Sequence, residues 1–80
     1  METKIAVVAI IVSDSNAVQQ INDILHAFGK DIIGRMGIPY KEKGVSVISI
    51  VMDADQQTIN SLSGKLGMIK GVSSKVLTTK

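Results

Sequence analysis

Two stretches of this chain are almost entirely apolar and rich in β-branched residues, Lys4 to Val12 (KIAVVAIIV) and Val45 to Met52 (VSVISIVM). Valine and isoleucine favour extended backbone, so both stretches are predicted to be strands. Successive side chains of a strand point to opposite faces of its sheet, and in both stretches each of the two sets is largely apolar. We therefore expect two strands at the centre of a sheet that has apolar residues on both faces.

A helix is predicted directly after the first stretch. Asp14, Ser15 or Asn16 can cap its N-terminus by accepting hydrogen bonds from backbone amides, and Gly29 can end it. Apolar residues at helical spacing mark its buried face: Ala17, Val18, Ile21, Ile24, Leu25 and Phe28.

The rest of the chain supplies the remaining elements. Asp31 to Ile38 is predicted to be a strand, Pro39 to Gly44 a turn, and Val72 to Thr79 a last strand. Asp53 or Asp55 can cap a second helix before that strand. The apolar face of this helix is marked by Ile59, Leu62, Leu66 and Ile69. The order of elements is therefore β-α-β-β-α-β.

This order predicts an α+β, ferredoxin-like fold over one domain, residues 1–80, with a four-stranded antiparallel sheet and two helices on one face. Two helices cover only one side of such a sheet. Because the central strands are apolar on both faces, we expect the other side to meet further copies of the chain in a dimer or tetramer. A charge at an outward residue such as Val8 or Ile10 is then expected to dissociate or unfold the protein.

Composition excludes several kinds of chemistry. The chain has no cysteine, which rules out disulfides, thiolate metal sites and cysteine nucleophiles. Its one histidine, His26, is expected on the exposed side of the first helix, where a single imidazole makes no metal site unless symmetry brings several copies together. No nucleophile, base and acid can be combined, and no phosphate-binding glycine loop occurs. We therefore expect no enzyme, no metal and no cofactor.

Charge and hydropathy exclude other partners. The formal net charge is only +2, from residues spread along the chain, so no direct nucleic-acid binding is expected. The apolar run from Ile5 to Val12 is too short to cross a membrane. With no sign of an oxidising compartment, a cytoplasmic location is expected.

One segment has residues that a plain connection does not need. It contains the only arginine, proline and tyrosine of the chain, and two glycines that let backbone approach a partner or ligand. Arg35 is expected to share a strand face with Ile33 and to pair with a carboxylate of an effector or of a neighbouring subunit, such as Asp31 or Glu42. The alternative is a hairpin corner with no further role. The candidate ligand or interface residues here are Gly34, Arg35, Met36, Gly37, Ile38, Pro39 and Tyr40.

The sequence also resembles a small family named as regulators of the iron-only hydrogenase system, whose ACT-like, ferredoxin-like domains are similar to the C-terminal half of nickel-responsive repressors. The resemblance covers almost the whole chain. It is carried by residues 24–26 (ILH), 33–40 (IGRMGIPY), 43–49 (KGVSVIS), 63–67 (SGKLG) and 71–72 (GV).

The resemblance implies a regulatory domain that senses a small ligand at a subunit boundary. In ACT-type domains the loop after the first strand lines the effector pocket, which implies a second role for Asp14 and Asn16 besides capping. Gly64 and Gly67 lie within the second helix pattern, where each costs about 1 kcal/mol relative to alanine, and they are expected to pack against a neighbour or ligand. The alternative for Gly67 is that it ends the helix. The alternative function is a protein–protein interaction module with no small-molecule ligand.

Overall fold

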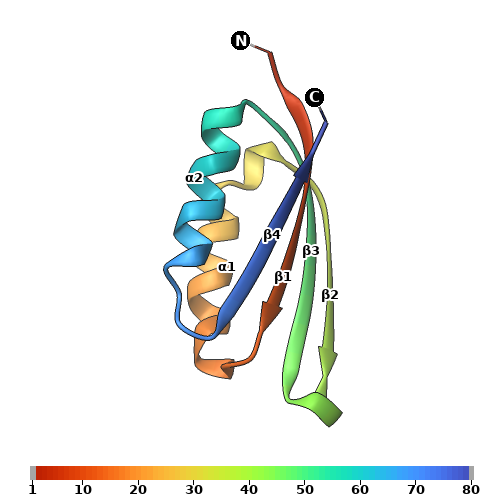
Figure 1. The fold of residues 1–80 in the computed structure, drawn as a ribbon, viewed down its shortest axis with the longest axis vertical. Helices are drawn as coiled ribbons and strands as arrows, with labels where there is room; N and C mark the ends of the chain where they lie inside the picture. The colour runs from red at the N-terminus through yellow and green to blue at the C-terminus, as the bar shows by residue number, and fades with distance from the viewer. Residues whose placement is uncertain (1, 80) are drawn as a thin grey trace.

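The computed structural model describes residues 2–79, and its β-branched stretches form the two central strands of a four-stranded antiparallel sheet (Figure 1). The order of strands across the sheet is β2-β3-β1-β4. The strands are β1 (Lys4–Val12), β2 (Ile32–Tyr40), β3 (Val45–Ala54) and β4 (Val72–Thr78), and the helices are α1 (Val18–Ala27) and α2 (Gln56–Gly67). This is the predicted β-α-β-β-α-β order, and the ferredoxin-like α+β fold is confirmed.

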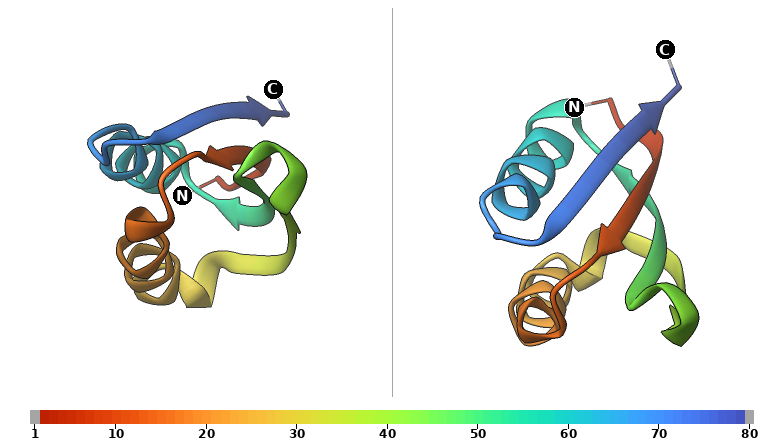
Figure 2. Two further views of the ribbon diagram at one scale, coloured as in Figure 1. Left: turned by 90° about the horizontal axis from the view of Figure 1, so that it is seen from below. Right: turned by 60° about the horizontal axis from the view of Figure 1, so that its bottom comes forward.

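Both helices lie on the same face of the sheet, as the two views of Figure 2 show, and the opposite face has no helix on it. Every other residue of β1 points toward the helices and is buried: Ala6, Val8, Ile10 and Val12. The core between sheet and helices is entirely apolar among the described residues. Its largest fully buried side chains are Val8, Ile10, Ile21, Leu25, Ile50, Met52, Ile59, Leu62 and Leu66.

The prediction that Val8 and Ile10 point away from the helices is therefore wrong. Val8 is 1% exposed and Ile10 is 0% exposed, so neither points outward, and a charge at either site would enter the core. The outward residues of β1 include Ile5, Val7 and Ile11. The sequence could not distinguish the faces because both sets are apolar.

A β-bulge in β2 changes which of its residues face the helices. Ile32 is opposite Met52 and Gly34 is opposite Val51, so Ile33 is the extra residue between them. Directly paired residues share a face, which puts Arg35, opposite Ile50, on the helix side. Ile33 is 63% exposed. The expectation that Arg35 and Ile33 share a face is wrong, because it assumed an unbroken alternation.

The ends of the elements differ in small ways from the predicted ones. Pro39 and Tyr40 belong to β2 rather than to the turn, which is compatible with a proline because β2 is an edge strand. A 3₁₀ helix, Lys41–Lys43, and Gly44 with φ of 65° complete the hairpin. Asp53 lies within β3 and is not the cap.

Two aspartates cap the helical segments. The Asp14 carboxylate accepts a hydrogen bond of 2.9 Å from the amide of Asn16, at the start of a 3₁₀ helix that leads into α1. The Asp55 carboxylate accepts one of 2.7 Å from the amide of Thr58 and caps α2. This hydrogen bond holds the pKa of Asp55 below its ordinary value.

Candidate functional site

The segment from Gly34 to Tyr40 is divided between the two faces of the sheet. Arg35, Gly37 and Pro39 pair with Ile50, Ile48 and Ser46 and lie on the helix side. The other four, Gly34, Met36, Ile38 and Tyr40, lie on the open side. The segment therefore does not form one cluster, and its residues contribute to two different surfaces.

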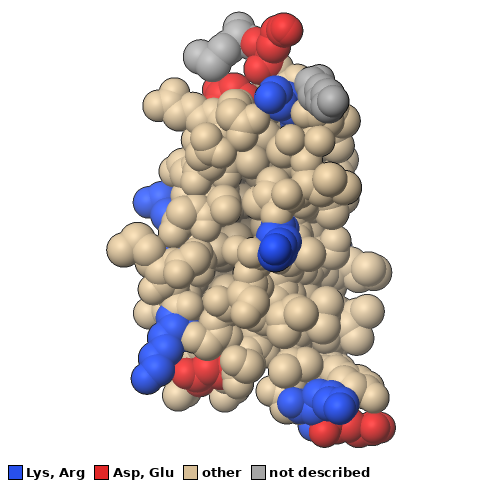
Figure 3. All heavy atoms as spheres, viewed as in Figure 1, with Lys and Arg blue, Asp and Glu red and all other residues tan. Residues whose placement is uncertain are grey.

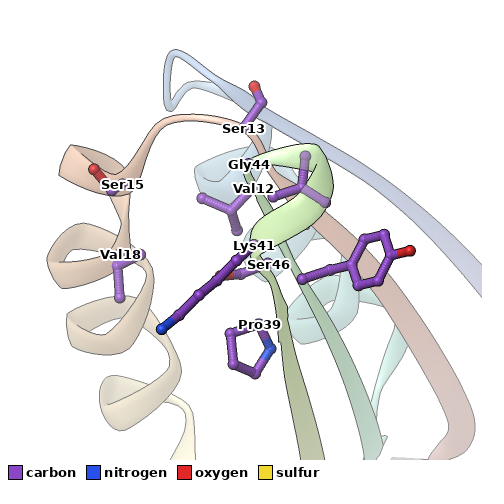
Figure 4. A pocket seen from close by; sticks show the side chains of 10 residues that line it. Val12, Ser13, Ser15, Val18, Pro39, Lys41, Gly44 and Ser46 are labelled. Carbon is purple, nitrogen blue, oxygen red and sulfur yellow. The ribbon is translucent and has the colours of Figure 1, made fainter.

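The first surface is a cleft between α1 and the end of the β2–β3 hairpin, which we call the hairpin cleft. It consists of two adjoining hollows of about 400 and 260 Å³ that share Val18, Pro39 and Ser46. The cleft remains open because two helix-side residues of β2 have little side-chain volume. Gly37 has no side chain, and Pro39 has only a compact ring. Figure 4 shows the larger hollow between the first turns of α1 and the hairpin.

Basic residues and serines line the hairpin cleft. The larger hollow is lined by Lys41 and by Ser13, Ser15 and Ser46, among others. In Figure 4 the Lys41 side chain reaches from the hairpin across the hollow toward Val18. The smaller hollow is lined by Arg35 and Asn22. No Asp or Glu of the described residues lines either hollow.

Within the described chain, Arg35 is held by α1. Its Nη2 donates a hydrogen bond of 3.2 Å to Oδ1 of Asn22. The Tyr40 hydroxyl donates to Glu42 of the same chain. Pairing of Arg35 with a carboxylate of an effector or of a neighbouring subunit stays a prediction. Because the amide of Asn22 is neutral, the contact orients the guanidinium without compensating its charge.

The second surface is the sheet face without helices, which we call the open sheet face. Register places Ile38, Val47 and Ile11 side by side on it, and likewise Val51, Val7 and Leu77. Its exposed large apolar side chains are Ile5, Val7, Ile11, Ile33, Met36, Ile38, Tyr40, Val47 and Leu77. Asp53 and Lys75 are the charged residues that register places among them.

Asp14 and Asn16 lie in a third place. Together with Gln20 and Lys70 they line a hollow of about 190 Å³ that shares no lining residue with the hairpin cleft. The loop after β1 thus divides its residues, with Ser13 and Ser15 lining the hairpin cleft and Asp14 and Asn16 lining this smaller hollow. Capping of the helical segment accounts for Asp14, and its second role stays a prediction.

Gly64 and Gly67 are on the exposed side of α2, away from both surfaces. A Cβ added at either position meets no atom within 4 Å, and the same holds for Gly34 and Gly37. Close packing within the described chain therefore does not explain these four glycines. Their packing against a neighbouring copy stays a prediction.

The described residues give little support for other kinds of site. His26 is exposed on α1, and residues 2–79 contain no group of three His, Cys, Asp or Glu residues that could hold a metal ion. None of the helices in this part of the chain is long and apolar enough to span a membrane. On the face shown in Figure 3, basic side chains are isolated or mixed with acidic ones and form no continuous stripe.

Sequence reasoning missed several lining residues of the hairpin cleft. The sequence pattern assigns Val18 to the apolar face of the helix and Ser15 to its possible cap, and it does not single out Lys41 or Ser46. Lys41 stands beside Tyr40 at the end of the hairpin, so its position next to the unusual segment was the available signal. The hydroxyl side chains gave none, because serine is common in loops and strands.

The fold and these surfaces define a small ferredoxin-like α+β domain with an uncovered apolar sheet face and a basic cleft at its hairpin. The chain belongs to the family described as "TM1266-like: Iron-only hydrogenase system regulator, putative", whose model matches residues 4–76. The family resemblance seen in the sequence is thereby confirmed. Among curated proteins, none matches the chain.

Solved structures agree with this assignment. The uncharacterized protein TM1266 from Thermotoga maritima is similar with a TM-score of 0.94 and 39% identity, over 99% of this chain and 100% of that one. A de novo designed protein, Foldit4, is similar with a TM-score of 0.59 and 20% identity, over 99% and 98% of the two chains. A nitrogen regulatory PII-like protein from Thiomonas intermedia K12, bound to ADP, AMP and bicarbonate, has a TM-score of 0.51 and 13% identity over the full length of both chains. The last two show the fold alone.

Proposed function

We propose that the chain is a non-catalytic regulatory domain that works as a homo-oligomer, assembled through the open sheet face, and that a small-molecule effector shifts this assembly. Family membership supports the regulatory role in the iron-only hydrogenase system. The proposal includes a cytoplasmic location and no nucleic-acid or membrane partner.

The observation that carries the proposal is the apolar surface of the open sheet face. Ile11 is 48% exposed, and its neighbours across the sheet, Val47 and Ile38, are 38% and 51% exposed. A monomeric protein rarely exposes a large contiguous apolar patch, so a continuous row of this kind favours association. A second copy is the favoured occupant because the same surface on each copy is self-complementary under two-fold symmetry.

The link between effector and assembly is supported by the alternation within β2. Pro39 lines both hollows of the hairpin cleft, and its neighbours Ile38 and Tyr40, which register places on the open side of the sheet, each line one of them as well. A molecule that moves the hairpin end at Pro39 also moves these two side chains. An effector shifts the oligomer only to the extent that it binds one arrangement more tightly than the other.

Light scattering and sedimentation of the wild type at micromolar concentration test the assembly. We expect a dimer or tetramer. We expect Ile11→Asp to dissociate it, because burying an unpaired charge in the interface costs on the order of several kcal/mol. Met68→Asp is the matched control, since Met68 is 87% exposed and lies after α2, away from the open sheet face. A wild-type monomer would overturn the proposal.

A thermal-shift screen with amino acids, nucleotides and other small metabolites tests the effector. Stabilisation together with a change in oligomeric state supports the sensing role. A stable oligomer that responds to no compound would favour the alternative, an interaction module that docks another protein through the segment from Arg35 to Tyr40.

A further inference from the structure

The hairpin cleft has two basic ends and an apolar middle. Lys41 lines the larger hollow but not the smaller one, and Arg35 lines the smaller but not the larger. Val18 and Pro39 line both hollows and so form the apolar part between the two cations. A cleft of this form fits an extended molecule with one charged group at each end.

The charge at each end is positive and is not matched by an acid of the cleft. No described Asp or Glu lines either hollow, and the partner of Arg35 is the neutral amide of Asn22. Glu42, the acid beside Lys41 in the chain, accepts a hydrogen bond from the Tyr40 hydroxyl. Tyr40 lines the larger hollow, but Glu42 itself does not.

Other polar side chains of the cleft can donate further hydrogen bonds. Ser46 lines the larger hollow together with Lys41, and Asn22 lies beside Arg35. A carboxylate accepts hydrogen bonds from hydroxyl, ammonium and guanidinium donors alike, and bonds to charged donors are the stronger ones. The volume of about 400 Å³ in the larger hollow lies in the lower part of the range of small-molecule sites, about 300–1,000 Å³.

We infer that the hairpin cleft binds a short linear dicarboxylate, with one carboxylate at Lys41, the other at Arg35 and the carbon chain against Val18 and Pro39. This inference rests on the proposed function, because it names the chemical class of the effector. It places the site within one copy of the chain, on the helix side of the sheet, rather than at the Asp14 and Asn16 hollow.

The binding experiment uses the wild-type protein and unbranched dicarboxylates of four to eight carbons. Binding is measured by calorimetry and by thermal shift. We expect affinity to depend on chain length with one maximum, because the two carboxylates must reach both cations. Monocarboxylates of the same lengths and the matching uncharged diols are expected to bind more weakly or not at all. Equal binding of every anion in the series would mean non-specific attraction and would overturn the inference.

Charge variants identify the site. Lys41→Gln and Arg35→Gln are each expected to weaken binding of the best dicarboxylate by about tenfold or more, the loss of one charge-assisted hydrogen bond. Lys43→Gln is the matched control, since it removes the same charge from the same 3₁₀ helix but from a residue that does not line the cleft. An equal loss in Lys43→Gln would contradict the assignment.

A filled cleft gives a second test that does not depend on charge. Gly37 lies on the helix side of β2, and a Cβ there meets nothing within 4 Å, so Gly37→Leu can enter the smaller hollow. We expect Gly37→Leu to abolish binding and Gly37→Ala to weaken it less, while both keep the melting temperature of a folded protein. Undiminished binding in Gly37→Leu would overturn the inference.

Scattering on the same samples separates this inference from the proposed function. Binding that depends on Lys41 and Arg35 without a change in oligomeric state would retain the site and reject its coupling to assembly. A dicarboxylate-dependent change of assembly that persists in both charge variants would retain the coupling and reject the site.

Discussion

Gly71 and Asp14 are in such close approach that a Cβ added to Gly71 would lie 2.5 Å from the Cβ of Asp14. The contact joins the loop after β1 to the connection between α2 and β4. Two hydrogen bonds to the Gly71 carbonyl strengthen it, from the amide of Ser13 at 2.8 Å and from its hydroxyl at 3.1 Å. Gly71 also has φ of 83°, which a residue with a side chain rarely adopts.

We predict that Gly71→Ala destabilises the protein more than Gly44→Ala does. Both glycines have positive φ, and for an L-residue this conformation costs about 1–2 kcal/mol. Gly44 has free space around it, so only that cost applies, whereas Gly71→Ala adds the clash with Asp14. Urea unfolding of both variants measures the difference. Equal free energies of unfolding would show that the clash relaxes without cost.

Gly64→Ala should have the opposite effect. Gly64 is inside α2 with nothing near its Cα, so alanine is expected to raise the free energy of unfolding by about 1 kcal/mol through helix propensity. Thermal unfolding at high dilution, where assembly contributes least, is the measurement. If Ala instead lowers the oligomeric state seen by scattering, a neighbouring copy packs against this glycine, as the sequence led us to expect.

Ile10 and Ile11 are neighbours in β1 with opposite roles. Ile10→Ala should cost about 2–5 kcal/mol, because it leaves a cavity in the core where Ile10 is 0% exposed. Ile11→Ala should cost the single chain much less and should instead weaken assembly. Denaturation over a range of protein concentrations separates the two effects, since only a loss of assembly changes with concentration. A similar, concentration-independent cost in both variants would contradict the assigned faces.

The order of elements could be predicted because each depends on local pattern. β1 begins and ends at the predicted residues, since its β-branched run is bounded by the polar residues of the following loop. The orientation of β1 could not be predicted, because Ala6, Val8 and Ile10 are as apolar as Ile5, Val7 and Ile11. Only the packing of the helices decides which set is buried.

The candidate site was less accessible to sequence reasoning. The segment around Arg35 was found from its composition, but the bulge at Ile33 leaves no mark in the residue types and reverses the face of Arg35. Lys41 lines the cleft only because the fold brings the end of the hairpin opposite α1, which the sequence pattern does not show. Contacts between segments far apart in the chain, such as Arg35 with Asn22, are set by the topology rather than by spacing.

The last prediction concerns pH and the cap of α2. The carboxylate of Asp55 accepts a hydrogen bond from the Thr58 amide, which lowers its pKa in the folded protein below the ordinary value of about 3.8. The ionised form is therefore favoured by folding, and its contribution to stability is fully present above that value. It is lost as the pH falls through the lower pKa of the folded state.

Asp55→Asn keeps an oxygen that can cap the helix but carries no charge at any pH. We expect wild type to melt higher than Asp55→Asn near neutral pH and this difference to shrink as the pH falls below about 3.8. Asp53→Asn is the control, since Asp53 lies in β3 and caps no helix. Melting curves between pH 7 and 2 make the comparison. A constant difference across that range would mean that the capping bond stabilises α2 without regard to the charge on Asp55.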